Sequence, residues 1–355
     1  MKLIVNKSVL EITLMNFQAF LDKKDSSQIT SHIYFESLDS KLLLRATDYE
    51  IGIEAKIDII KKESEGNATV NGRIILDIVK KLEDGEIILE TDNDFFYIKQ
   101  GRTKYKESMF NAAEFPIFPK MTDYTKLNID TSKFITSIKK INPAIETTNQ
   151  KMELNGAFLD IKDYSYNFVA TDTRRLAVVK YETQSVDNLS IIIPKKATIE
   201  ILKLFYDEFE IYYNQSQIII KTEQYMFFTK LINGKYPDYE KIIPKTFKNE
   251  IKLPKDIIEK SIKKVNLCSN IKITIKPKEI FFEAISDESS RTANTQIELD
   301  TQIQSDITIG ANSKYILDFF SQIEDSEFLL CLNDSNNPFV LKDKNFSTIV
   351  MPIIF

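Results

Sequence analysis

A pattern of about 120 residues occurs three times along this chain, and this repeat constrains the fold more than any other feature. The segment IYFESLDSKLLLRATD (33–48) returns as AFLDIKDYSYNFVATD (157–172), and a more divergent third copy is IKITIKPKEIFFEAISD (271–287). In each copy, two runs of alternating apolar residues flank a short polar turn, which predicts a pair of antiparallel strands. A chain of 355 residues is long enough for three such units.

Each repeat also contains two short segments with apolar residues at helical spacing. The expected helices span 7–21, 72–83, 132–142, 195–206, 254–266 and 312–323. In the fifth of them, Ile257, Ile258, Ser261, Ile262 and Val265 form one stripe that we expect to be buried. The sequence therefore predicts an α+β fold of three similar domains, at 1–125, 126–249 and 250–355, each with antiparallel sheet and two helices.

Basic residues are concentrated on the expected helices. These six segments hold 15 Lys and Arg against seven Asp and Glu, whereas the whole chain has 47 against 52. The strands and loops must therefore be strongly acidic. Basic helices that recur in every repeat suit a sequence-independent contact with phosphates. The alternative interpretation is a set of solvated helix faces, because lysine is an ordinary residue on a helix surface.

Nothing in the sequence indicates catalysis, a cofactor or a metal. With eight glycines in all, the chain has no phosphate-binding glycine motif. The single histidine, His32, precedes a strand and is expected to be a polar surface or strand-end residue. Asp48 and Asp172 are repeat equivalents that each follow a strand, so we interpret them as turn or capping residues rather than as a catalytic pair. A non-catalytic protein is expected.

The expected location is the cytoplasm. No apolar run approaches the roughly 18 residues that a membrane span needs, and the N-terminal MKLIVNKSVLEITL lacks the pattern of a signal peptide. Cys268 and Cys331 form no CxxC or Cys/His cluster, which fits a reducing compartment. We expect both to be core thiols.

Several motifs resemble the bacterial DNA polymerase III beta subunit, the beta sliding clamp family. They are ATDTRRLAVVK (170–180), GKYPDYEKIIP (234–244), STIVMPIIF (347–355), MELNGAFL (152–159), IGANSKYILDFF (309–320), GRTKY (101–105) and AAEFP (112–116). The resemblance spans the chain in order. It implies a head-to-tail homodimer that closes into a ring around duplex DNA, with helices inside and sheets outside. The ring would associate with the nucleoid.

The resemblance further implies partners and sites. The expected partners are duplex DNA, a second copy of the chain, the clamp loader complex, the replicative DNA polymerase alpha subunit, repair polymerases, mismatch-repair proteins and DNA ligase. The family's apolar partner-peptide groove falls here on Leu154, Thr171, Thr173, Arg174, Arg175, Leu176, Pro237, Lys241, Ile242, Ile349, Val350, Met351, Pro352 and Ile353. Arg175 is expected to serve backbone carbonyls or acidic groups of the peptide.

By the same resemblance, the DNA-contacting residues are expected to be Lys24, Lys80, Lys139, Lys140, Lys151, Lys203, Lys263 and Lys264. The dimer interface is expected at Tyr105, Glu107, Leu267 and Cys268.

The sequence departs from the family pattern at the groove and at the dimer edge. Thr173 and Arg174 stand where the family usually has Gly and an aromatic residue or His, which predicts a bulkier and more basic rim. Lys241 replaces the usual Arg and loses its bidentate fork. Glu107 falls where an apolar residue is expected.

A repeat-built interaction scaffold without nucleic acid remains the competing hypothesis. It explains the acidic composition, but it leaves the recurrence of lysine on the helices unexplained. It predicts that binding does not depend on salt.

Overall fold

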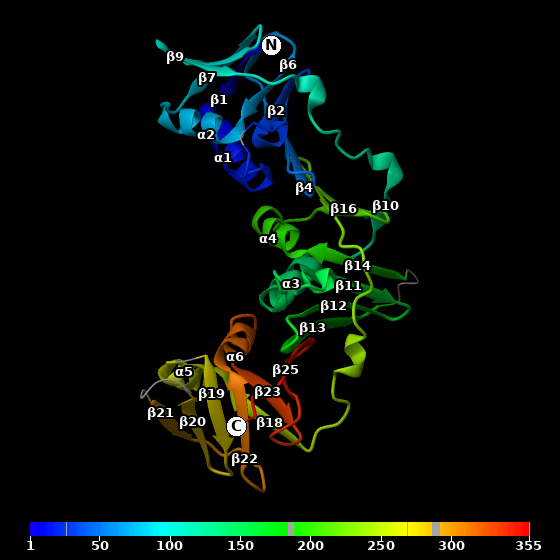
Figure 1. Cartoon of the computed structure of the whole chain (residues 1–355), viewed down its shortest axis with the longest axis vertical. Helices are drawn as coiled ribbons and strands as arrows, with labels where there is room; N and C mark the ends of the chain where they lie inside the picture. The colour runs from blue at the N-terminus through cyan, green and yellow to red at the C-terminus, as the bar shows by residue number, and fades with distance from the viewer. Residues whose placement is uncertain (26, 184–187, 268, 286–291, 355) are drawn as a thin grey trace. The chain divides into compact units, whose positions relative to one another are not determined.

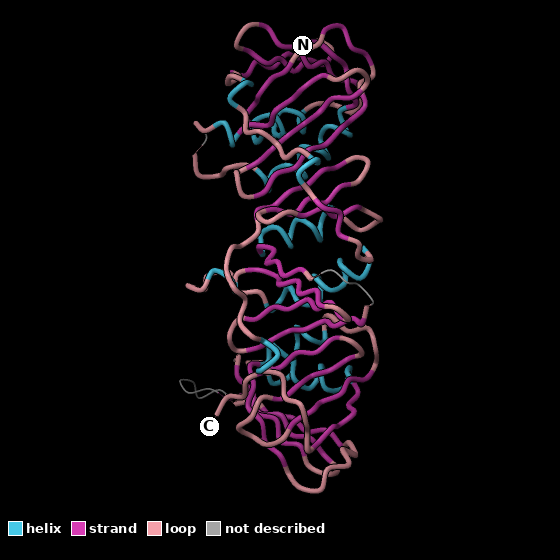
Figure 2. The backbone as a smooth tube through the Cα atoms, turned by 90° about the vertical axis from the view of Figure 1, so that its right-hand side faces the viewer, coloured by secondary structure: helices cyan, strands magenta, loops and turns pink. Residues whose placement is uncertain are grey.

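The computed structural model describes residues 1–25, 27–183, 188–267, 269–285 and 292–354. They form two compact units: residues 1–132 with 203–231, and residues 133–202 with 232–355. Every sheet described in either unit is antiparallel, and Figure 2 shows that strands make up most of each unit while the helices are short. The predicted α+β class is confirmed. No described helix is both long and apolar enough to cross a membrane.

The described residues of the first unit form two sheets. In spatial order, the smaller sheet is β5 (Lys61–Ser64), β1 (Lys2–Asn6), β7 (Glu86–Asp92), β8 (Phe95–Gln100) and β9 (Thr103–Ser108). The larger is β10 (Thr125–Leu127), β15 (Glu210–Tyr213), β16 (Gln217–Lys221), β17 (Tyr225–Lys230), β4 (Ile51–Asp58), β3 (Lys41–Thr47), β2 (His32–Ser37) and β6 (Asn67–Asn71).

The described residues of the second unit also form two sheets, and Figure 1 labels all of their strands except β24. The larger is β14 (Leu189–Pro194), β11 (Gly156–Lys162), β12 (Ser165–Thr171), β13 (Arg175–Glu182), β25 (Phe346–Val350), β24 (Phe339–Asp343), β23 (Glu327–Leu332) and β18 (Asn249–Pro254). The smaller is β21 (Asn294–Glu298), β20 (Glu279–Ile285), β19 (Asn270–Ile275) and β22 (Ile307–Asn312).

The three expected strand pairs are β2–β3, β11–β12 and β19–β20, and all three are confirmed. Asp287, the last residue of the third copy, lies outside the described residues. The larger sheets join strands of different repeats, because β4 pairs with β17 and β13 pairs with β25. The compact units therefore follow the shared sheets, and the boundaries 1–125, 126–249 and 250–355 stay a prediction.

In the part of the chain that the structure describes, six α-helices occupy the predicted places: α1 (Lys7–Phe17), α2 (Gly72–Lys81), α3 (Thr131–Ile141), α4 (Lys195–Leu204), α5 (Lys255–Val265) and α6 (Ser313–Phe320). Asn6, Asn71 and Asn312 cap the N-termini of α1, α2 and α6 by accepting backbone N–H bonds. The observed α5 buries Ile258, Ser261, Ile262 and Val265 as predicted. Ile257 is 48% exposed, so its assignment to the buried stripe is wrong.

In two of the repeats, the lysine at the start of one helix donates a hydrogen bond to a backbone carbonyl in the segment after the other helix. Lys195 Nζ donates to the Ile145 carbonyl at 2.7 Å, and Lys255 Nζ donates to the Ile323 carbonyl at 2.6 Å. Ile145 follows the short helical turn Asn142–Ala144 at the end of α3, and Ile323 lies three residues after the end of α6. Both lysines are therefore used by the fold, and a basic helix residue is not automatically available to a phosphate.

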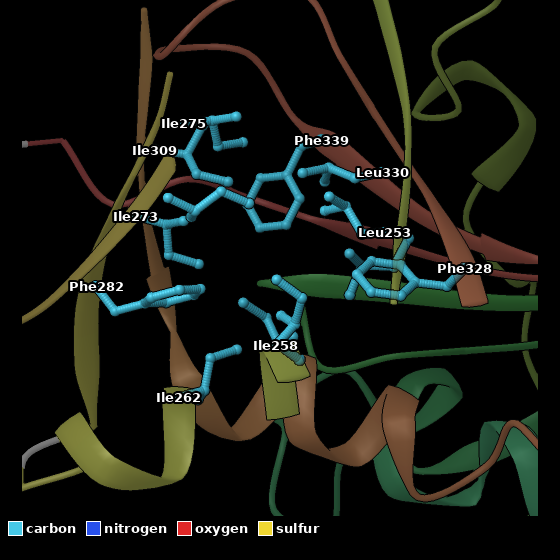
Figure 3. Close-up of a pocket in the computed structure, with 13 residues that line it drawn as sticks. Leu253, Ile258, Ile262, Ile273, Ile275, Phe282, Ile309, Phe328, Leu330 and Phe339 are labelled. Atoms are coloured by element: carbon cyan, nitrogen blue, oxygen red, sulfur yellow. The ribbon is translucent and has the colours of Figure 1, made fainter. Parts of the chain in front are cut away.

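The core of the third repeat lies between its two sheets (Figure 3). Ile258 and Ile262 of α5 point toward Ile273 and Phe282 on one side and toward Phe339 on the other. These side chains leave a cavity of about 20 Å³ with an entirely apolar lining. Since no polar group is present to hold a water, the cavity is a packing gap rather than a ligand site.

Candidate functional site

The turn between β12 and β13 is built by Asp172. Its Oδ1 accepts backbone N–H bonds from Arg174 at 3.0 Å and Arg175 at 2.9 Å. Asp48 holds the equivalent turn between β3 and β4 in the same way, by accepting from the Ile51 N–H at 3.0 Å. Both aspartates are turn residues, as the sequence predicts. Thr173, at the tip of its turn, has a φ of 74°, a left-handed conformation that strains a β-branched residue.

Arg175 is buried, and its guanidinium points into the fold. Nε donates to Asp172 Oδ2 at 3.0 Å, one terminal nitrogen donates to Asp318 Oδ2 at 2.7 Å, and the other donates to the Pro143 carbonyl. The same group lies 4.4 Å from the centroid of the Tyr315 ring. Arg175 therefore joins β13, the segment after α3 and helix α6. These bonds favour a structural role over the peptide contact expected from the sequence.

The residues predicted to form the apolar floor of the groove do pack together, but their side chains are buried. Leu154, Leu176 and Ile349 are each at most 2% exposed and belong to one apolar cluster. Leu176 lies opposite Ile349 in the β13–β25 pairing, and Arg175 lies opposite Val350. Because neighbouring strand residues face opposite sides of a sheet, Val350 shares the face of Arg175. The predicted set is thus divided between two faces of one sheet.

The accessible part of the site is its rim. Ile242 is 45% exposed and Met351 is 41% exposed. The rim also contains the exposed Thr173, Arg174 and Lys241 and the half-buried Thr171, Pro237, Pro352 and Ile353. The Met351 N–H donates to the Arg174 carbonyl at 2.9 Å, which fixes the C-terminal segment beside the turn. Two apolar side chains next to a buried apolar floor can receive the apolar residues of a short peptide.

Residues 231–248 connect β17 to β18, and we call them the linker. The linker carries Pro237 and Ile242 and is anchored by two tyrosines that were not among the predicted site residues. Tyr236 stacks on Phe158 with ring centroids 4.4 Å apart, and the Tyr239 hydroxyl donates to Asp160 Oδ2 at 2.8 Å. Burial, with the Asp160 carboxylate next to it, raises the pKa of Tyr239. The motif KYPDY (235–239) contained this signal, since tyrosines around a proline suit a segment packed on a sheet.

The lysines predicted to contact DNA are mostly exposed. Lys80, Lys139, Lys203, Lys263 and Lys264 lie on helices, and Lys24 and Lys151 lie in loops. Lys140 is half-buried, with its ammonium 5.5 Å from the centroid of the Phe346 ring. Lys263 pairs with Glu259 at 2.5 Å. Lys24, Lys80 and Lys203 belong to the first compact unit, and the other five belong to the second.

The predicted dimer residues lie at two places. Tyr105 and Glu107 belong to β9, the edge strand of its sheet, and both are half-buried. Leu267 follows α5 and is 57% exposed, while Cys268 lies outside the described residues.

The remaining candidates have no catalytic setting. His32 is the first residue of β2, as one sequence alternative predicts, but it is buried and stacks on Phe110 with centroids 4.0 Å apart. Burial lowers the pKa of His32 to about 4. Cys331 is a core thiol as predicted, and burial raises its pKa to about 11. Within the described ranges, no three His, Cys, Asp or Glu side chains gather as a metal site requires.

Comparison with known proteins covers the whole chain. Models of the DNA polymerase III beta subunit match at 1–119 (N-terminal domain), 128–238 (central domain) and 240–354 (C-terminal domain). The beta sliding clamp of Helicobacter pylori strain J99 is 38% identical, over 99% of this chain and 100% of the relative. That of Buchnera aphidicola subsp. Rhopalosiphum padi is 28% identical, over 98% and 97%.

Solved structures agree with these relatives. The Helicobacter pylori beta clamp bound to a DNA ligase peptide matches with a TM-score of 0.93 and 38% identity, over 100% of both chains. The DNA polymerase sliding clamp of Bacillus subtilis has the same fold, with a TM-score of 0.92 and 22% identity, over 100% of this chain and 99% of that one. The chain therefore belongs to the DNA polymerase III beta subunit family, the beta sliding clamps, which are non-catalytic processivity factors.

Proposed function

We propose that two copies of this chain close into a ring around duplex DNA in the cytoplasm, on the nucleoid, and there tether other proteins. The clamp loader complex places the ring. The rim at Ile242 and Met351 then holds peptides of the replicative DNA polymerase alpha subunit, repair polymerases, mismatch-repair proteins and DNA ligase. One relative was crystallised with a DNA ligase peptide, which supports peptide binding by this family.

The observation that carries the DNA contact is the distribution of charge. The observed helices α1 to α6 contain 15 Lys and Arg and six Asp and Glu, although the whole chain has more acids than bases. Basic helices that recur in all three repeats can follow a phosphate backbone without reading bases. Lys195 and Lys255 are bonded to backbone carbonyls within the fold. The proposed DNA contacts are therefore the exposed helix residues Lys80, Lys139, Lys203, Lys263 and Lys264, the loop residues Lys24 and Lys151, and the half-buried Lys140.

Two free sheet edges support ring closure. β9 ends its sheet with exposed Lys104 and Lys106, and β21 ends another sheet with exposed Glu298. An edge strand presents unpaired backbone groups that a second copy can complete. Pairing β9 of one copy with β21 of the next joins opposite charges, and such a head-to-tail contact closes a ring when it is made twice. Tyr105 and Leu267 would pack beside this junction. Each copy contributes three domains, at 1–125, 126–249 and 250–355, so the ring of two copies contains six domains.

Retention on circular DNA tests the ring. The purified protein is loaded onto nicked circular DNA by its clamp loader, gel-filtered, and then filtered again after the circle has been cut. We expect co-elution with the circle and loss after cutting, since only topological linkage depends on closure of the DNA. Retention on both forms would mean direct affinity and refute the ring. Retention on neither, with a loader that loads a known clamp, would favour the interaction scaffold.

A pair of matched variants tests the closing edge. Lys106→Glu places a negative charge on β9 and should abolish retention on the circle. Lys61→Glu changes a 64% exposed lysine on β5, the opposite edge of the same sheet, and should load like the wild type. Equal loss in both variants would mean that β9 has no special role.

A further inference from the structure

A second groove lies on the larger sheet of the second unit, under the end of the linker. Its floor contains Val178 of β13, Leu329 of β23 and Val340 of β24, and its wall is formed by Ile243 and Phe247 of the linker. We call this space the outer groove. Its volume is about 620 Å³, within the roughly 300–1,000 Å³ range of ligand-binding clefts.

The outer groove adjoins the proposed peptide site. Ile349 belongs to the predicted peptide site and also lines the outer groove. Leu176 lies opposite Ile349, and alternation along β13 places Leu176 and Val178 on the same face. All three belong to one apolar cluster, against which Ile243 and Phe247 pack. Ile242 and Ile243 are consecutive, so two adjacent linker residues serve the two sites. Ile242 belongs to the rim of the peptide site, and Ile243 belongs to the wall of the outer groove.

The rim of the outer groove has unused positive charge. Lys180, Lys245 and Lys342 line it and are exposed. Among the residues that the structure describes, no carboxylate pairs with these three ammonium groups, whereas neighbouring Lys344 pairs with Asp325 at 2.7 Å. Two acids, Glu182 and Glu250, share the rim. An apolar floor under an excess of cations suits a chain that has apolar side chains next to a carboxylate.

We propose that the outer groove is a second seat for the same partner peptide. It takes the residues that continue the chain beyond the short motif held at Ile242 and Met351, and it selects an extension with an apolar residue followed by Asp or Glu. This inference rests on the proposed peptide-binding function. A partner whose peptide carries such an extension binds more tightly than one that carries the short motif alone.

Fluorescence anisotropy with peptides of two lengths tests the proposal. The short peptide carries one Leu and one Phe as the apolar residues for the rim at Ile242 and Met351, and the long peptides add about eight residues with Phe and Asp on its N-terminal or C-terminal side. We expect one long peptide to bind at least about tenfold more tightly than the short one. The double variant Lys180→Glu with Lys342→Glu should remove most of that gain, at least about fivefold, and leave the short peptide within twofold. Lys260→Glu, an exposed lysine on α5, is the matched control and should change neither affinity.

The outcomes separate the two proposals. If none of the three peptides binds, the peptide-binding function itself fails, and this inference fails with it. If the short peptide binds and both long ones bind no better, only the second seat is refuted. Loss of affinity for both lengths in the double variant would also refute it, since the lysines would then act on the first site.

Discussion

Arg175→Ala should destabilise the second unit by about 4 kcal/mol. A hydrogen bond to a charged group contributes about 1.5–3 kcal/mol when its partner is left unsatisfied. The Asp172 and Asp318 side chains are 16% and 24% exposed, so each regains some water in the variant, and we take about 1 kcal/mol for each. The Pro143 carbonyl and the Tyr315 ring add about 1 kcal/mol each. The total lies within the roughly 3–5 kcal/mol expected when a buried pair is broken.

Urea unfolding followed by circular dichroism measures this loss. The matched control is Arg174→Ala, which removes an exposed guanidinium next to it and should change stability by less than about 0.5 kcal/mol. Affinity for the short motif peptide is measured on both variants under conditions where both are folded. A loss below about 1 kcal/mol in Arg175→Ala, together with a tenfold or larger loss of peptide affinity, would show that this guanidinium serves the peptide and not the fold.

Three further predictions concern buried groups. Burial lowers the pKa of His32 from 6.5 to about 4, so between these pH values the unfolded chain binds more protons than the folded one. The free energy of unfolding should therefore fall by up to about 3 kcal/mol as the pH drops through this range. His32→Phe should flatten this part of a plot of urea midpoint against pH, and an unchanged plot would contradict the burial argument. Gly156→Ala would place a Cβ 2.5 Å from the Ile193 carbonyl oxygen, so thermal unfolding should show a loss of about 2 kcal/mol or more, and wild-type stability would mean that β11 and β14 can separate freely. In a Cys268→Ser background, the Cys331 thiol, whose pKa burial raises to about 11, should react with a thiol reagent at pH 8 only after denaturation, because it is 2% exposed although it lines the outer groove. Rapid labelling of the native protein would show that the thiol is reached from this groove.

Much of the fold could be predicted from the sequence because its signals are local. The six helices and the three hairpins follow from spacings of apolar residues, and such spacings do not depend on distant contacts. The turn role of Asp172 was predictable for the same reason, since its hydrogen bonds reach only two and three residues along the chain. Ile257 was assigned wrongly because periodicity locates a stripe but not its edge.

The candidate site could be predicted only in part. Position-by-position resemblance located the exposed rim, where Ile242 and Met351 lie. It missed Tyr239 and Asp160, because a hydroxyl and a carboxylate 79 residues apart meet only through the path of the linker. It also missed the outer groove, which no single segment forms.

The sequence by itself determined the threefold repeat, the antiparallel α+β class and the concentration of positive charge on the helices. Each of these is a property of spacing or composition within a short window. Only the tertiary structure decided that Arg175 faces the fold while Leu176 faces the linker. That choice depends on the pairing of β13 with β25, strands far apart in the chain, because a one-residue change of register would exchange the two faces.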